Sequence, residues 1–271
     1  FCLADFPKII STYPDELRYF QIARSLANGN GLAFHNVSSD FQKILYSVII
    51  APAFMFNVSV EAQIKIINLI NCIVMSSSIF PVYFLAQRLL KDKKIFVLLA
   101  SVIVLLMPDM VYSMSFMSEV IFFPLSLWII YVFYRLFLTV NYKKQLLYNI
   151  VLGILIYLVY LCKEIGLYFI LAYTMIMLLE CIKEKTSIKN RLISLGLCWI
   201  SFIAIYLLFK LTFFYGMGSS YDQMSIDAIL KPYNFLYMIY GFMYNLLFIL
   251  VAFLFFPAVL PAFSLKKISK E

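Results

Sequence analysis

Long apolar runs separated by short charged turns make up most of the chain. Seven of them approach the roughly 20 mainly apolar residues that a bilayer-spanning helix needs. They cover about 62–88, 95–112, 119–139, 146–162, 166–182, 192–214 and 235–263. The first and the last exceed one hydrocarbon thickness, which indicates tilt or extension beyond the bilayer. The pattern predicts an all-α polytopic membrane protein with about seven transmembrane helices.

The first sixty residues show a different pattern. The apolar run 44–56 is too short to span and contains Pro52, which favours a re-entrant or interfacial helix. Upstream of it, the segment after Thr12 predicts a short amphipathic helix on the membrane surface that ends at the "NGNG" of residues 28–31. We therefore expect two parts: a first extracytoplasmic loop with interfacial helices (1–61) and a transmembrane helical domain (62–271).

Basic residues mark every second turn between the runs. Fourteen of the 22 Lys and Arg lie in these turns: Arg88, Lys91, Lys93, Lys94, Arg135, Lys143, Lys144, Lys183, Lys185, Lys189, Arg191, Lys266, Lys267 and Lys270. Cytoplasmic loops of membrane proteins carry such an excess of positive charge. The other turns, at 1–61, 107–119, 162–165 and 215–234, are then predicted to lie outside, and we expect the plasma membrane as the location.

Composition agrees with this class. Hydrophobic residues make up 64% of the chain and charged residues 13%, which excludes a water-soluble domain. The net charge of +8 follows from the basic turns, so we expect the lipid bilayer and no nucleic acid as a partner. Five cysteines without a C-x-x-C spacing and a single histidine, His35, indicate neither a disulfide framework nor a zinc site. The chain starts at Phe1 in what resembles the end of an apolar segment, so a fragment lacking a first span is expected.

Residues 12–29, "TYPDELRYFQIARSLANG", hold the densest charge of the first loop. Thr12 can cap a helix whose first turn contains Pro14, and Asp15 and Glu16 then lie at the positive end of the helix dipole. Local structure alone can explain both acids. A carboxylate on an interfacial helix is also placed to take a proton from an acceptor hydroxyl while a lipid-borne donor reaches it from the bilayer. Both interpretations of Asp15 remain open from the residues alone.

Three segments in order resemble the start of the GT-C superfamily of integral-membrane glycosyltransferases: "YPDELRYFQIARSLANGNGL", "ILYSVIIAPAFMF" and "VYFLAQRLLKDKK". Members such as the protein O-mannosyltransferases and the lipid A aminoarabinose transferases use polyprenyl-phosphate sugars and carry a D-E-x-x-Y type motif in the first outer loop. Further on, "MPDMVYSMSFMSEVIFFPLSLW" resembles the second outer loop, and "LCKEIGLYF" resembles a T-K-x-x-G turn with Cys162 in place of Thr. The resemblance covers most of residues 12–182 and weakens afterwards.

The resemblance implies roles for four residues. Asp15 is the implied catalytic base, and Glu16 supports it or binds the acceptor. Glu119 matches the outer-surface acid of the second loop, and Lys163 the cation that meets the carrier phosphate. Each also has a structural interpretation: Glu119 starts a helix, where the dipole favours an acid, and Lys163 with Glu164 keeps a tight hairpin in water.

The roles of three further residues stay open. Asp109 is either a loop residue or a substrate ligand. The same two interpretations apply to Glu164 on the next outer turn. Lys210 lies near the outer end of an apolar run, where snorkelling to the interface is favoured over contact with the donor phosphate.

The resemblance implies a glycosyltransferase that moves a sugar from a polyprenyl-phosphate carrier to an extracytoplasmic glycan, lipid or protein acceptor with inversion of configuration. No redox or nucleotide cofactor is implied. A divalent cation near the phosphate stays open, with Asp15 and Glu119 as its ligands, although no residue spacing requires a metal. The alternatives are a transporter or flippase of lipid-linked glycans, a polymerase or ligase, and a non-catalytic membrane subunit.

Overall fold

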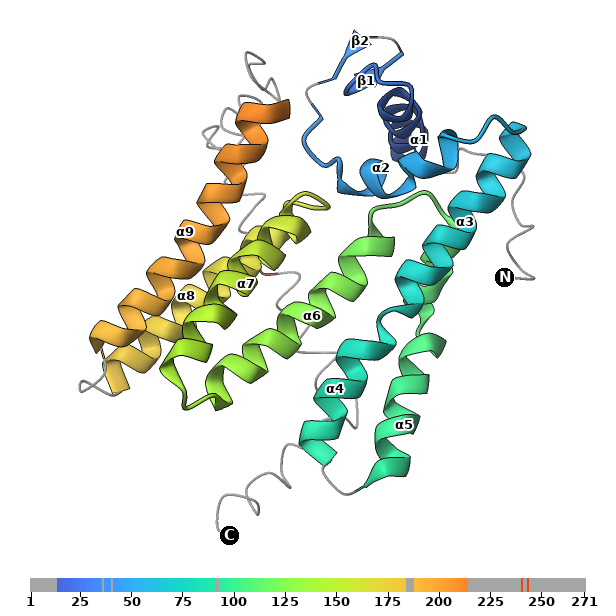
Figure 1. The fold of residues 1–271 in the computed structure, drawn as a ribbon. Coiled ribbons are helices and arrows are strands. Elements are labelled where there is room, and N and C mark those ends of the chain that lie inside the picture. Colours follow the sequence, from blue (N-terminus) through green and yellow to red (C-terminus); the bar gives the residue numbers. More distant parts are fainter. Residues whose placement is uncertain are drawn as a thin grey trace. The chain divides into compact units, whose positions relative to one another are not determined.

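The computed structural model describes residues 14–35, 37–39, 41–90, 93–183 and 188–213, together with Tyr240 and Met243. Of these residues 81% are helical and 2% form strands, which confirms the all-α class. The chain divides into two units, and every helix discussed below belongs to the first, Phe1–Met217. The elements are α1 (Pro14–Ala27), β1 (Ala33–Phe34), β2 (Val37–Ser38), α2 (Leu45–Ile50), η1 (Ala51–Phe54), α3 (Val60–Ser76), α4 (Ile79–Leu90), α5 (Lys94–Ile103), η2 (Val104–Leu106), η3 (Pro108–Met114), α6 (Glu119–Leu138), α7 (Tyr142–Tyr160), α8 (Gly166–Lys183) and α9 (Ile188–Phe213) (Figure 1).

Within the described residues, four helical segments are long and apolar enough to cross a membrane: Val60–Leu90, Glu119–Leu138, Tyr142–Tyr160 and Ile188–Thr212. The predicted spans at 95–112 and 166–182 coincide with shorter apolar helices, Lys94–Leu106 and Gly166–Ile182. Apart from Tyr240 and Met243, the seventh predicted span at 235–263 lies outside the described residues. The structure thus supports a membrane protein, and four of the seven predicted spans coincide with helices long and apolar enough to cross a bilayer.

The span predicted at 95–112 is shorter than expected. Helical structure from Lys94 ends at Leu106, because Met107 is extended (φ −65°, ψ 145°) ahead of Pro108. A residue that precedes proline is driven out of the helical region by the proline ring. With a rise of about 1.5 Å per residue, this helix reaches only about 20 Å, short of a hydrocarbon core of roughly 30 Å.

The long first span is broken into α3 and α4. Pro81 has no N–H to donate to the carbonyl of Ser77 four residues earlier, and its ring crowds that carbonyl. The Ser77 carbonyl accepts a bond from the Phe80 N–H instead, at 3.1 Å, and the helix changes direction at Ser77–Ser78. This break accounts for part of the excess length that the sequence pattern assigned to tilt.

Helix α7 packs against α6, α8 and α9 in one buried cluster. Gly153 on α7 allows the closest approach, since a Cβ at this position would lie 2.4 Å from the backbone oxygen of Cys198 and 2.8 Å from the Cβ of Ser201 on α9. Asn149, also on α7, accepts a hydrogen bond from the Tyr173 hydroxyl of α8. Small-residue contact and a buried polar pair therefore fix these three helices together.

The first loop contains the two short helices predicted for it. Helix α1 ends at Ala27, and the chain turns through Gly29 (φ 74°) and Gly31 (φ 70°), a conformation that glycine adopts without strain. The run 44–56 forms α2 and η1, with Tyr46, Ile50 and Ala53 fully buried. It is a short helix, as predicted. Thr12, the predicted cap of α1, lies outside the described residues.

Candidate functional site

Three segments distant in sequence meet at one end of the helices. The carboxylate of Glu16 on α1 accepts a hydrogen bond of 3.1 Å from the backbone N–H of Phe116, ahead of α6. The ammonium group of Lys163, in the turn between α7 and α8, donates to Glu119 at 2.5 Å. The first loop, the second loop and the α7–α8 turn, each singled out from the sequence, thus form one cluster.

The α7–α8 turn also reaches α2, where the Leu45 N–H donates to the Leu161 carbonyl at 3.4 Å. Tyr46 and Asn71 extend this contact into the interior. The Tyr46 hydroxyl donates to Asn71 Oδ1 at 3.1 Å, and Asn71 Nδ2 donates to the Ser115 carbonyl at 2.9 Å. Backbone and buried amide groups therefore hold the loops in register around the cluster.

Helix α1 places its two acids in different environments. Its buried face includes Tyr19, Ile22 and Ala23, and Glu16 joins them at 5% exposure. The Asp15 side chain is 56% exposed and lies 4.0 Å from Arg18. Asp15 shares a helical stripe with Tyr19 and Ile22, but only Tyr19 and Ile22 are covered by neighbouring elements. Glu16 therefore has a structural contact, whereas Asp15 is accessible to a substrate.

Tyr19 lies near two carboxylates, those of Asp15 and Glu119. Its side chain is hydrogen-bonded to that of Ser118, the residue before α6, and burial raises the pKa of the phenol to about 12. The negative charges of Asp15 and Glu119 add to this increase, so both carboxylates act on the same hydroxyl. Tyr19 is the Tyr of the D-E-x-x-Y pattern, a signal that was visible in the sequence but was not given a role.

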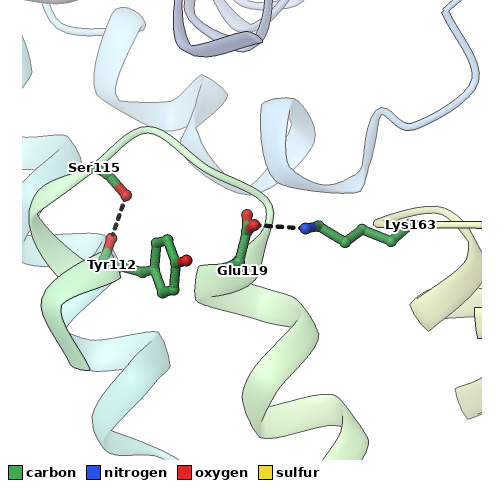
Figure 2. A network of polar contacts seen from close by, with 4 residues as sticks. All are labelled: Tyr112, Ser115, Glu119 and Lys163. Atoms are coloured by element: carbon green, nitrogen blue, oxygen red, sulfur yellow. Dashed lines mark hydrogen bonds and ion pairs between the residues drawn. The ribbon is translucent and has the colours of Figure 1, made fainter. Parts of the chain in front are cut away.

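The Glu119–Lys163 pair lies at the centre of the cluster (Figure 2). The side chains are 19% and 31% exposed, and the second carboxylate oxygen of Glu119, Oε2, is buried with no hydrogen-bond partner among the described residues. Ahead of the pair, the Ser115 hydroxyl donates to the Tyr112 carbonyl at 3.0 Å and shapes the loop that leads into α6. The pair thus retains a free acceptor oxygen beside a cation.

Lys43 is a second cation at this place that the sequence analysis did not single out. Its ammonium group lies 3.5 Å from the centroid of the Tyr160 ring. Burial raises the pKa of the Cys162 thiol, and the charges of Lys43 and Lys163 partly offset that increase. Two cations therefore act on the position where the resembling family has threonine, and the thiol there is buried and neutral.

The cluster does not include three of the residues named from the sequence, Asp109, Glu164 and Lys210. Asp109 in η3 and Glu164 in the α7–α8 turn are exposed, and neither forms an ion pair with another described residue. Lys210 is exposed in the last turns of α9, with its ammonium group 5.8 Å from the Tyr206 ring centroid, an arrangement consistent with snorkelling. The substrate-binding roles of Asp109 and Glu164 stay predictions.

The described residues of the cluster offer few ligands for a divalent cation. In the part of the chain that the structure describes, no three His, Cys, Asp or Glu side chains gather closely enough to hold a metal ion. Of the two carboxylates considered as ligands for such an ion, Glu119 already binds Lys163 through one of its oxygens.

Comparison of the chain with protein-family models, with curated proteins and with solved structures finds no match.

Proposed function

We propose that the protein is a membrane glycosyltransferase of the GT-C type, which moves a sugar from a polyprenyl-phosphate carrier to an acceptor on the extracytoplasmic side of the plasma membrane, with inversion of configuration. The observation that carries the proposal is that an accessible carboxylate, Asp15, and the Glu119–Lys163 pair both lie near Tyr19, because the charges of Asp15 and Glu119 act on the same hydroxyl. Apolar helices long enough to span a bilayer begin and end at this junction, where a lipid-linked donor has access.

The donor phosphate is assigned to the cations of the cluster. A phosphate leaving group develops negative charge as the glycosidic bond breaks, and a positioned ammonium group stabilises that charge. The charges of Lys163 and Lys43 are both felt at Cys162, so a phosphate group bound beside the α7–α8 turn would be attracted by two cations. Glu119 holds Lys163 in place through their ion pair, so that the ammonium group stays at the α7–α8 turn.

The proposed reaction is a single displacement. An acceptor hydroxyl loses its proton to Asp15 while its oxygen attacks the anomeric carbon of the donor sugar. The bond between that carbon and the phosphate oxygen breaks, and the phosphate leaves on the lipid with the bonding electrons. One base and one stabilised leaving group are sufficient for inversion. Glu16 has a positioning role in this scheme, because its carboxylate binds the Phe116 N–H.

The sidedness of the site follows from charge. The described turns at the other ends of the spans carry basic residues, among them Arg88, Lys93, Arg135 and Lys144. Positive charge marks the cytoplasmic side, so the cluster is assigned to the outer side.

The test compares Asp15→Asn with the parent protein in membranes supplied with radiolabelled polyprenyl-phosphate sugars. Transfer of label is expected to fall by about 10²- to 10⁴-fold, the usual contribution of general-base catalysis. Glu61→Gln is the matched control, since Glu61 is an exposed acid at the start of α3 that forms an i,i+4 ion pair with Lys65. A normal transfer rate in Asp15→Asn, or a product with retained anomeric configuration, would falsify the single-displacement scheme.

A further inference from the structure

A polar cavity of about 380 Å³ lies on the other side of α1 from the cluster described above. Its walls are Gln21, Arg24, Ser25, Asn28, Asn30, Ala33 and His35. Three of these residues, Gln21, Arg24 and Ser25, share the face of α1 opposite its buried face, and Asn28 follows directly after the end of the helix. The others come from the glycine turn and from the β1–β2 ribbon, which packs beside α1 (Figure 1).

The cavity is held open by specific contacts. The Gln21 side chain accepts a hydrogen bond of 3.1 Å from the His35 backbone N–H, and the Ser25 hydroxyl donates to the Gly31 carbonyl at 2.9 Å. His35 has a φ of 50°, a left-handed conformation that is uncommon for residues other than glycine and clusters at functional sites. These bonds tie the turn and the ribbon to α1, so the wall is built by the fold.

Among the described residues that line the cavity, the charged side chains are basic. Arg24 is exposed and forms no ion pair with any described residue. His35, the only histidine of the chain, is exposed on the opposite wall with its ring 4.2 Å from that of Phe34. A guanidinium group and an imidazole are suited to a carboxylate or phosphate, with which they form charge-assisted hydrogen bonds.

The remaining walls offer neutral hydrogen-bonding groups. The amides of Asn28 and Asn30 both donate and accept, as the hydroxyls of a sugar do, and both side chains are exposed to the cavity. A volume of about 380 Å³ lies at the lower end of the range for small-ligand sites, roughly 300–1,000 Å³. Size and chemistry therefore fit a single saccharide unit with one anionic group.

We propose that this cavity binds an anionic sugar, a saccharide unit that carries a carboxylate or a phosphate. That the bound sugar is part of the acceptor rests on the proposed function, whereas the binding itself does not. The cavity lies on the opposite side of the helix that presents Asp15, so an acceptor anchored there by its anionic sugar would have to extend around α1 to reach the base.

Saturation-transfer NMR on the full chain in lipid nanodiscs tests the binding, with no donor present. The probes are D-glucuronate, D-glucose 6-phosphate and D-glucose at equal concentration. At least one anionic sugar is expected to give several-fold more transfer than glucose, and the better of the two identifies the anionic group. Arg24→Gln is expected to lower that signal by about tenfold. Lys65→Gln, which removes an exposed cation of α3 outside the cavity, is expected to leave it unchanged.

His35→Asn is a second variant, because asparagine tolerates the left-handed conformation while the imidazole is lost. It is expected to weaken binding of the anionic sugar without changing the thermal unfolding temperature. Equal transfer from anionic and neutral sugars, or an unchanged signal in Arg24→Gln, overturns the proposal. It is also overturned if inorganic phosphate displaces the anionic sugar as effectively as glucose 6-phosphate does, because the sugar hydroxyls would then contribute nothing. If the parent protein bound the anionic sugar but transferred no label from the polyprenyl-phosphate sugars, the result would count against the proposed function and not against this binding site.

Discussion

The Glu16 carboxylate and the Phe116 backbone N–H, one hundred residues apart in the chain, form a hydrogen bond of 3.1 Å in the buried part of the candidate site. Phe116 leads into α6, whose first residue is Glu119. Together with Asn71, whose amide donates to the Ser115 carbonyl, this acceptor on α1 fixes the second loop that carries Glu119 against the helix that carries Asp15. The adjacent acids of the first loop have divided roles: Glu16 positions the loop, and Asp15 faces solvent.

Glu16→Ala is expected to destabilise the protein by about 1–3 kcal/mol, because the buried Phe116 N–H loses its acceptor. Glu16→Gln keeps an amide oxygen at the same place and is expected to cost less. Thermal unfolding in detergent measures both. The control is Glu61→Ala, which removes an exposed i,i+4 ion pair with Lys65 and is expected to change stability by less than about 1 kcal/mol. Equal effects of Glu16→Ala and Glu61→Ala would show that the Glu16 contact contributes nothing.

Gly153→Ala is expected to destabilise the packing of α7 on α9 by about 1–3 kcal/mol, the usual range for overpacking. The added Cβ would lie 2.4 Å from the Cys198 backbone oxygen, so the helices must move apart. Gly196→Ala on α9 is the matched control, because a Cβ there meets nothing within 4 Å and alanine favours the helix. The unfolding midpoint is expected to fall for the first variant and to hold or rise for the second. A fall of similar size in both contradicts the close approach.

Much of the arrangement could be predicted from local pattern. The end of α1 follows from the glycine turn at Gly29, and the shortness of α2 follows from the length of its apolar run and from Pro52. Proline also explains two features of the spans. Pro81 lies just after the break between α3 and α4 within the first span, and Pro108 follows the early end of the helix that begins at Lys94. Both effects are local enough to be predicted from the sequence.

Other features depend on contacts that no local pattern contains. Asp15 and Glu16 are adjacent acids in the first turn of α1, and only the position of Phe116 decides which of them is buried. Lys43 joins the site through the ring of Tyr160, far away in sequence. The sequence pattern predicted the three segments that meet in the site. Which side chains of these segments face one another depends on tertiary packing.

Lys163→Met is expected to raise KM for the polyprenyl-phosphate donor and to lower kcat/KM by about 10- to 100-fold, since a charge-assisted bond to phosphate is lost. Lys163→Arg keeps the cation and is expected to retain most of the activity. The Glu119 contact would also be lost in Lys163→Met, so Glu119→Gln is assayed beside it to separate donor binding from loop positioning. Similar losses in the Met and Arg variants would indicate that packing, and not charge, is what Lys163 supplies.

Tyr19 provides a pH-dependent test of the site. Its pKa is raised by burial to about 12 in the folded protein, against about 10 for an exposed tyrosine. The folded state therefore holds this proton more tightly than the unfolded state, and the resulting stability is fully present below pH 10. As the pH rises from about 10 to 12, the unfolded phenol ionises first, and the free energy of unfolding is expected to fall by up to about 1.4 kcal/mol per pH unit.

Tyr19→Phe isolates this contribution from those of the other tyrosines. The variant loses the hydrogen bond to Ser118, which lowers its stability by a roughly constant amount below pH 10. Above pH 10 the difference between the parent protein and the variant is expected to narrow and then change sign, because only the parent carries the phenol that must stay protonated. Denaturation midpoints of both proteins at intervals between pH 8 and pH 12 measure that difference. A difference that stays constant over the whole range would mean that the Tyr19 hydroxyl is hydrated in the folded state.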